Sequence, residues 1–165
     1  RDVTGVQTCA LPIYREVVMK ILVDADACPV KNIIETTAQQ YKLEVIMICC
    51  VNSPVTSQYA QVIIVDGFSQ AADIAIVNKT EKGDIVVTHD YGVAAMVLEK
   101  GARAINPSGK EYTDNNIEEL LMQRFINFKA RQSGMRTTRF KKRNREDDEH
   151  FKKTFVNLIE KSLLD

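Results

Sequence analysis

The sequence predicts an α/β fold, a doubly wound and mainly parallel five-stranded sheet, and three observations lead to it. Short apolar runs rich in β-branched residues, such as Ile21–Val23 and Ile85–Val87, indicate strands that are buried on both faces, as in a parallel sheet. These runs alternate with segments whose apolar residues recur at helical spacing. Two acids, Asp24 and Asp26, directly follow the first run, and Pro29 then favours the start of a helix. The first strand therefore ends in carboxylates.

The first half of the chain supplies three strands and two helices. After the strand at Ile21–Val23, apolar residues at helical spacing predict a helix from Pro29 to Tyr41. The next elements along the chain are strands at Leu43–Val51 and Val62–Val65 and a helix at Gln70–Lys79, which Ser69 can cap.

The second half continues the alternation and then becomes helical. We expect a strand at Ile85–Thr88, a helix at Tyr91–Lys100 closed by Gly101, a short strand at Ala102–Ile105, a turn at Asn106–Gly109 and a long helix at Asp114–Gln132. The apolar stripe expected on the long helix consists of Ile117, Leu120, Leu121, Phe125 and Phe128. A basic, irregular stretch, Ser133–Arg145, leads to a last helix that begins at the acidic run Glu146–Glu149. The apolar stripe expected on this last helix consists of Phe151, Phe155, Leu158 and Ile159. Right-handed crossovers leave few topologies, and we expect the strand order 3-2-1-4-5.

Length and charge suggest one domain with a basic C-terminal extension. The chain has 165 residues and a formal net charge of zero, but residues 19–119 contain fourteen acids and eight bases, whereas residues 120–165 contain twelve bases and six acids. An acidic body with a basic tail favours a polyanionic partner near a metal site, or simply a solvated tail. We place the α/β domain at residues 19–132, with the basic loop and C-terminal helix, 133–165, packing on the same domain.

The first eighteen residues differ in character from the rest. The segment Val3–Ile13 resembles the conceptual translation of a sequencing-adapter read, and it lacks the ordered parts of a secretory signal. We therefore expect Met19 to be the true start. The four cysteines include an adjacent pair, Cys49 and Cys50, and show no C-x-x-C spacing, so we expect a reducing cytoplasm. No apolar run is long enough to span a membrane.

The carboxylates are the candidate site. In the expected strand order, strands one and four are neighbours at the point where the order reverses, which is where open α/β sheets bind ligands. Asp24, Asp26 and Asp90 would then meet at one sheet edge, and Asp73, on the helix at 70–79, is a fourth candidate. Oxygen ligands suit Mg²⁺ or Mn²⁺, which activate water for phosphoester hydrolysis. For Asp26 alone, capping of the following helix is an equally good interpretation.

Three neighbouring residues have lesser roles in this hypothesis. The Thr88 hydroxyl could orient a ligand or a water molecule. His89 should alternate to the side opposite Asp90, so we assign it a structural or accessory role. Cys28 stands near a helix start, but thiol phosphatases need an arginine six residues further on, and Ile34 occupies that position.

Several separate motifs together resemble the YaiI/YqxD family of bacterial proteins. They are Asp24-Ala-Asp-Ala-Cys-Pro29, Gln70-Ala-Ala-Asp-Ile-Ala-Ile76, Gly83-Asp-Ile-Val-Val-Thr-His-Asp90 and Asn106-Pro-Ser-Gly-Lys-Glu-Tyr112. That family is similar to a divergent branch of the PIN-like fold, whose best-known members are Mg²⁺-dependent ribonucleases. PIN-type nucleases place acids after the first strand, on a middle helix and after the fourth strand, and Asp24, Asp73 and Asp90 match these positions. Asp26 is an additional acid that the family shows beside the first.

The resemblance implies a metal-dependent nuclease that acts on RNA, with DNA as the other candidate substrate. In that hypothesis Asp24, Asp73 and Asp90 are catalytic and bind the ion, and Asp26 assists. The bases between Arg124 and Arg145, among them Arg139, Lys141, Lys142 and Arg143, bind phosphates.

Two alternatives stay open from the sequence. Asp24-x-Asp26 after a buried strand also fits a phosphatase of the haloacid-dehalogenase type, although that chemistry needs a later lysine and a second acid pair, for which only Asp147-Asp148 is present. The other alternative is a non-catalytic RNA-binding protein with the same fold.

Overall fold

The computed structural model describes residues 19–68, 70–136 and 141–165. It contains one sheet in the order β3-β2-β1-β4-β5-β6, parallel except for β6. The strands are β1 (Lys20–Asp24), β2 (Glu44–Cys50), β3 (Gln61–Val65), β4 (Ile85–Val87), β5 (Arg103–Ile105) and β6 (Glu111–Tyr112). The helices are α1 (Lys31–Tyr41), α2 (Ala71–Lys79), α3 (Tyr91–Glu99), α4 (Asp114–Gln132) and α5 (Arg145–Leu164).

The predicted α/β class and strand order are therefore confirmed, with one addition. β6 is a two-residue strand that pairs antiparallel with β5, so the sheet has six strands among the described residues rather than five. The turn at Asn106–Gly109 brings β6 back onto the edge of β5: the Asn106 N–H donates to the Lys110 carbonyl at 2.8 Å. Too short to show an alternating pattern, β6 could not be recognised from the sequence.

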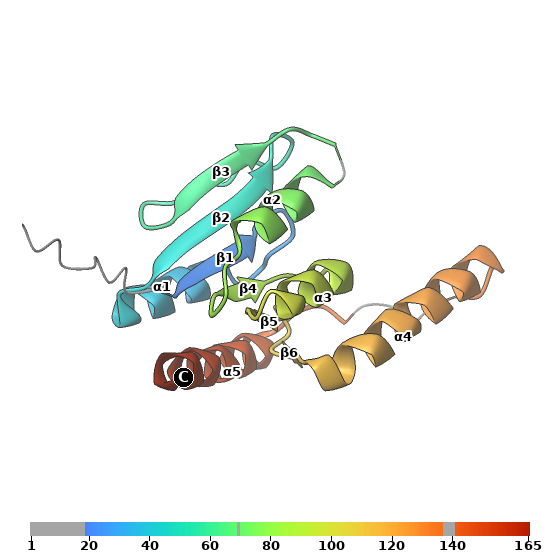
Figure 1. Cartoon of the computed structure of the whole chain (residues 1–165). Coiled ribbons are helices and arrows are strands. Elements are labelled where there is room, and N and C mark those ends of the chain that lie inside the picture. The colour runs from blue at the N-terminus through green and yellow to red at the C-terminus, as the bar shows by residue number, and fades with distance from the viewer. Residues whose placement is uncertain (1–18, 69, 137–140) are drawn as a thin grey trace, which may run out of the picture.

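The sheet lies between two helical layers (Figure 1). Consecutive strand residues point to opposite faces: Ile21 and Val23 of β1 pack with α1 and α5, whereas Leu22 packs with α2 and α3. The expected apolar stripe of α5 is fully buried, and its members are Phe151, Phe155, Leu158 and Ile159. This helix completes the layer that α1 begins. No helix of the described chain is long and apolar enough to cross a membrane.

The starts of α1 and α2 differ from the sequence expectation. α1 begins at Lys31, and Pro29 lies in the preceding turn rather than at the first helical position. Asp26 does not cap this helix, because its carboxylate accepts a hydrogen bond from the Cys50 N–H at 2.7 Å. At α2 the N-cap position is Gln70. The Ser69 cap and the expectation for residues 1–18 lie outside the described residues.

The long helix α4 has the predicted bounds but not a buried stripe. Ile117 is buried and Leu120 is half-buried, where the start of the helix packs against the α2–α3 side of the sheet. The other members of the predicted stripe, Leu121, Phe125 and Phe128, are exposed. The rest of α4 runs outward from the body of the molecule (Figure 1).

At the edge of the sheet remote from the carboxyl ends, Asp84 is buried rather than lying in an exposed turn. It accepts hydrogen bonds from the Lys20 N–H at 3.1 Å and the Glu81 N–H at 2.8 Å, and it pairs with the Lys20 ammonium at 3.0 Å. These contacts tie the start of β1 to the start of β4. They fix the relative placement of the two strands whose opposite ends carry the candidate site.

Candidate active site

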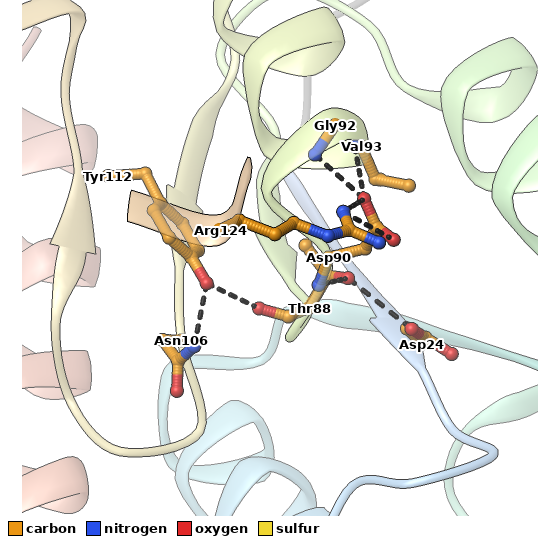
Figure 2. A network of polar contacts seen from close by, with 8 residues as sticks. All are labelled: Asp24, Thr88, Asp90, Gly92, Val93, Asn106, Tyr112 and Arg124. Atoms are coloured by element: carbon orange, nitrogen blue, oxygen red, sulfur yellow. Dashed lines mark hydrogen bonds and ion pairs between the residues drawn. The ribbon is translucent and has the colours of Figure 1, made fainter. Parts of the chain in front are cut away.

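The register of β1 against β4 brings the first carboxylate to the site. Val23 pairs with Val87, so Asp24 and Thr88 come next to each other where these strands end. The Thr88 hydroxyl donates to Asp24 Oδ2 at 3.3 Å and accepts from the Asp90 N–H at 3.0 Å (Figure 2). Thr88 is buried, so it joins the ends of the two strands through a single hydroxyl.

Asp90 is the N-cap of α3, and its position follows from that role. Its Oδ1 accepts from the N–H groups of Gly92 and Val93 at 2.7 and 3.1 Å. A carboxylate at a helix N-terminus is stabilised both by these hydrogen bonds and by the helix dipole. An aspartate directly after a strand and before a helical pattern is a sequence signal for a helix N-cap.

The four predicted carboxylates line one cavity. It has a volume of about 520 Å³ and lies at the carboxyl ends of the strands. Asp24, Asp26, Asp73 and Asp90 all contribute to its wall, from β1, the turn after it, α2 and the start of α3. All four acids therefore line the same cavity at this edge of the sheet.

Burial and repulsion between the acids raise the pKa values of two of them. Burial, followed by the charge of Asp26, raises the pKa of Asp24 above its ordinary value. Burial also raises the pKa of Asp73, and the charges of Asp90 and Asp24 add to it. Like charges that share a partly buried site disfavour ionisation of both groups, and a cation would relieve that cost.

The acids nevertheless do not form a preformed metal cluster. Within residues 19–68, 70–136 and 141–165, no three or more His, Cys, Asp or Glu side chains are placed so that they could hold a metal ion. The reason lies in their local partners: Asp26 is held by the Cys50 N–H and Asp90 by the first turn of α3. Carboxylate oxygens are suitable ligands for a hard divalent cation. In their present positions, however, the four side chains are too far apart to share one ion, so they would have to turn toward one another to bind it.

Arg124 enters this cavity from α4. Its Nη1 lies 3.4 Å from both carboxylate oxygens of Asp90 (Figure 2). Among the described residues that line the cavity, Arg124 is the one that is an arginine or a lysine. Arg124 was predicted only as part of the basic segment. It lies 34 residues from Asp90 along the chain, so no local pattern linked it to the acids. An exposed arginine on a helix gives no signal of what it reaches.

His89 also lines the cavity, contrary to the expectation that it would point to the side opposite Asp90. The chain leaves the strand after Val87, so the alternation of strand side chains no longer holds at His89. Burial, followed by the charge of Arg143, lowers the pKa of the imidazole. Both effects favour the neutral form of the ring.

The cysteines near the site remain thiols. Burial raises the pKa of Cys28, and a hydrogen bond to Asp26 raises the pKa of Cys50 to about 11. A thiol with a raised pKa is a poor nucleophile at neutral pH. This agrees with the rejection of a thiol mechanism on sequence grounds.

The four predicted phosphate-binding bases divide into three cases. Lys141 and Lys142 are exposed. Arg143 has internal partners: it donates to Asp148 Oδ1 at 2.6 Å and to the Pro107 carbonyl at 2.8 Å, which fastens the start of α5 to the β5–β6 turn. These contacts give Arg143 a structural role within the chain, whereas its role in phosphate binding stays a prediction. Arg139 lies outside the described residues.

A second cavity, of about 440 Å³, adjoins the first between α2 and α3. It shares Asp73, Asp90 and Arg124 with the first cavity. Its other walls carry the amides of Gln70 and Asn78 and the apolar side chain of Met96. The two cavities therefore lie on either side of the Asp90–Arg124 ion pair and share its side chains.

Comparison with known proteins identifies the family. Residues 22–161 match the family described as "Uncharacterized BCR, YaiI/YqxD family". The chain belongs to the YaiI/YqxD family. A UPF0178 protein from Alkaliphilus oremlandii is 46% identical over 146 residues, which cover 88% of this chain and 94% of the relative. A UPF0178 protein from Clostridium kluyveri is 49% identical over 141 residues, covering 86% and 93%.

One solved structure is similar in outline. It is the crystal structure of a mutant of Rae1 (YacP) from Bacillus subtilis, 16% identical, covering 88% of this chain and 91% of that chain with a TM-score of 0.39.

Proposed function

We propose that this YaiI/YqxD protein is a divalent-metal-dependent nuclease that hydrolyses phosphodiester bonds in RNA. The observation that supports it most is the meeting of Asp24, Asp26, Asp73 and Asp90 in one cavity at the switch point of a parallel sheet. Raised pKa values of Asp24 and Asp73 indicate carboxylates that a cation would stabilise in the ionised form.

In this proposal Asp24, Asp73 and Asp90 hold Mg²⁺ or Mn²⁺, and Asp26 assists. The ion, when bound, supplies a Lewis acid for the phosphate and a water molecule of lowered pKa. Thr88 keeps Asp24 and the backbone of Asp90 in register. With a cation held by Asp90, the guanidinium of Arg124 that now pairs with this carboxylate would be available to bind a phosphate oxygen.

The surroundings of the cavity favour a nucleic-acid substrate. The neighbouring cavity gives room for a nucleotide next to the phosphate, with amides from Gln70 and Asn78 available for a base edge. Lys141 and Lys142 supply exposed positive charge. The free thiols of Cys28, Cys49 and Cys50 support a reducing cytoplasm as the compartment.

The phosphatase alternative loses support from the placement of its required groups. No lysine contributes to the cavity among the described residues. Its only candidate acid pair opens α5, where Asp147 accepts from the Asn144 N–H at 2.9 Å and Asp148 pairs with Arg143 at 2.6 Å. Both acids therefore lie at the start of α5, which packs with α1 on the face of the sheet opposite to α2 and Asp73.

The test is incubation of the full chain with single-stranded RNA, the matching DNA and a chromogenic phosphomonoester, each with Mn²⁺, Mg²⁺ or EDTA. We expect RNA cleavage that requires the metal and disappears in Asp24→Asn and Asp90→Asn. Asp66→Asn is the matched control, because this exposed acid follows β3 at the sheet edge but is not among the residues lining the carboxylate cavity. Cleavage that persists in EDTA or in Asp24→Asn contradicts the proposal, and RNA binding without cleavage would leave the non-catalytic alternative.

A further inference from the structure

The helix α4 carries an exposed apolar face that the rest of the described chain does not cover. Met122, Phe125 and Ile126 are 59%, 56% and 51% exposed, and Leu121 beside them is also exposed. These four residues follow the i, i+1, i+4, i+5 spacing that keeps them on one side of a helix. Neighbouring large apolar side chains exposed on one helix indicate an interaction surface.

The opposite side of the same helix faces the body of the protein. Ile117 is buried, Leu120 is half-buried against the α2–α3 side of the sheet, and Arg124 reaches Asp90. The exposed face is therefore not the side that α4 uses within its own chain. In Figure 1, α4 extends away from the sheet, which leaves this face accessible to a partner.

Oppositely charged residues lie at the two ends of this face. Glu118 lies one turn before Leu121, Lys129 lies one turn after Phe125 and Ile126, and both are exposed. The order along the face is thus acid, two apolar residues, two apolar residues, base. The pattern is symmetric about the midpoint between Gln123 and Arg124, because each residue before this point has a counterpart at the same distance after it. The mirrored pairs are Glu118 with Lys129, Leu121 with Ile126, and Met122 with Phe125.

We propose that the occupant of this face is α4 of a second copy of the chain, packed antiparallel about a two-fold axis through that midpoint. A two-fold axis brings each residue opposite its mirror position in the partner, as in other isologous interfaces. Leu121 then packs on the partner's Ile126, and Met122 on the partner's Phe125. Glu118 meets the partner's Lys129 at both ends, so the charges are complementary only when the helices run antiparallel.

A different partner explains the face less well. Exposed phenylalanines next to Arg124, Lys129 and Arg131 could stack on the bases of a single-stranded nucleic acid. That interpretation leaves the aliphatic Leu121, Met122 and Ile126 without a role and places acids at Asp114, Glu118 and Glu119 beside a polyanion. Self-association accounts for both the aliphatic side chains and the acids.

The experiment is sedimentation equilibrium of the full chain across a wide range of protein concentration, in the wild type and in charge-reversed variants. We expect the wild type to approach twice the molar mass of one chain. Glu118→Lys and Lys129→Glu should each weaken dimerisation about tenfold, because two ion pairs of exposed groups become two repulsions. The double variant should recover wild-type affinity, and the two single variants should pair with each other when mixed.

Glu119→Lys is the matched control, since it changes the same charge on the neighbouring residue outside the mirrored set, and it should dimerise as the wild type does. Circular dichroism of each variant checks folding. A wild type that stays monomeric at all concentrations overturns the proposal, as does a double variant that is no better than the single ones. If the chain is monomeric and Phe125→Ser weakens RNA binding, the face is a nucleic-acid surface instead.

Discussion

The hydroxyl of Thr88 donates to the carboxylate of Asp24 across the seam between β1 and β4 at 3.3 Å. Because it also accepts from the Asp90 N–H, one buried side chain connects the acid that ends β1 with the acid that begins α3 (Figure 2). The positions of both acids therefore depend on a residue that has no charge of its own.

Thr88→Val tests this connection, since valine keeps the shape and removes the hydroxyl. The change leaves a buried acceptor and a donor without their partner, so we expect a loss of about 1–3 kcal/mol in the free energy of unfolding. Thr88→Ser keeps the hydroxyl and should retain most of the stability. Urea unfolding measures both variants, and equal stability of the valine and serine variants would contradict the proposed connection.

Metal binding should stabilise the fold. Mn²⁺ at about one hundred times its Kd contributes about 2.7 kcal/mol, which corresponds to a rise in Tm of about 5–10 °C for a domain of this size. Asp24→Asn and Asp90→Asn should lose this rise, whereas Asp66→Asn should keep it. Differential scanning calorimetry with Mn²⁺ and with EDTA decides the question, and isothermal titration gives the affinity. Equal Mn²⁺ affinity in the wild type and both site variants would exclude a metal site at these acids.

Arg124 should compete with the metal for Asp90. The ion pair is partly exposed, so its removal in Arg124→Gln should cost the fold less than about 1 kcal/mol and should tighten Mn²⁺ binding by about two- to fivefold. RNA cleavage should fall in the same variant, because the guanidinium that binds the phosphate is gone. Tighter metal binding together with weaker cleavage distinguishes this role from simple support of the fold. Weaker Mn²⁺ binding in Arg124→Gln would show that Arg124 helps to form the metal site.

The stability of the metal-free protein should depend on the ionisation of Asp24. Its pKa is raised in the folded state, chiefly by burial and then by Asp26, so the native state binds this proton more tightly than the unfolded chain does. The contribution of Asp24 to stability therefore falls as pH rises from its unfolded pKa through its folded one. Asp24→Asn cannot ionise, so its stability relative to the wild type should increase over that pH interval. Urea titrations in EDTA from about pH 4 to pH 7 measure the difference, and a constant difference would argue against the raised pKa.

The basic segment should divide into binding and structural residues. Lys141→Gln with Lys142→Gln should weaken RNA binding and reduce the slope of log K against log salt by about 1.4–1.8, with an unchanged Tm. Arg143→Gln should instead lower the free energy of unfolding, by about 1–3 kcal/mol, because Asp148 and the Pro107 carbonyl lose a charged donor. If the lysine variants instead lost stability and Arg143→Gln lost only RNA affinity, the lysines would be the structural residues and Arg143 the RNA-binding one.

The sequence alone predicted five of the six described strands, the five described helices and the identity of the four acids that line the cavity. Unbroken β-branched runs such as Ile21–Val23 can be satisfied only by burial on both faces, and alternation with helical segments then requires a parallel sheet. The stripe Phe151, Phe155, Leu158 and Ile159 likewise predicted a buried helical face. These signals are local, because they depend on the period of the apolar residues and on the residues next to each strand end.

Tertiary structure decided which polar groups meet and which faces remain open. The partner of Asp26 proved to be a backbone N–H of β2, 24 residues away, and the partner of Asp90 an arginine of α4. The spacing of α4 predicted an apolar stripe but not that Leu121 and Phe125 would be exposed, because periodicity specifies a face and not what packs on it. Contacts between distant residues depend on strand register and on the direction in which a helix leaves the sheet, and neither is encoded in a local pattern.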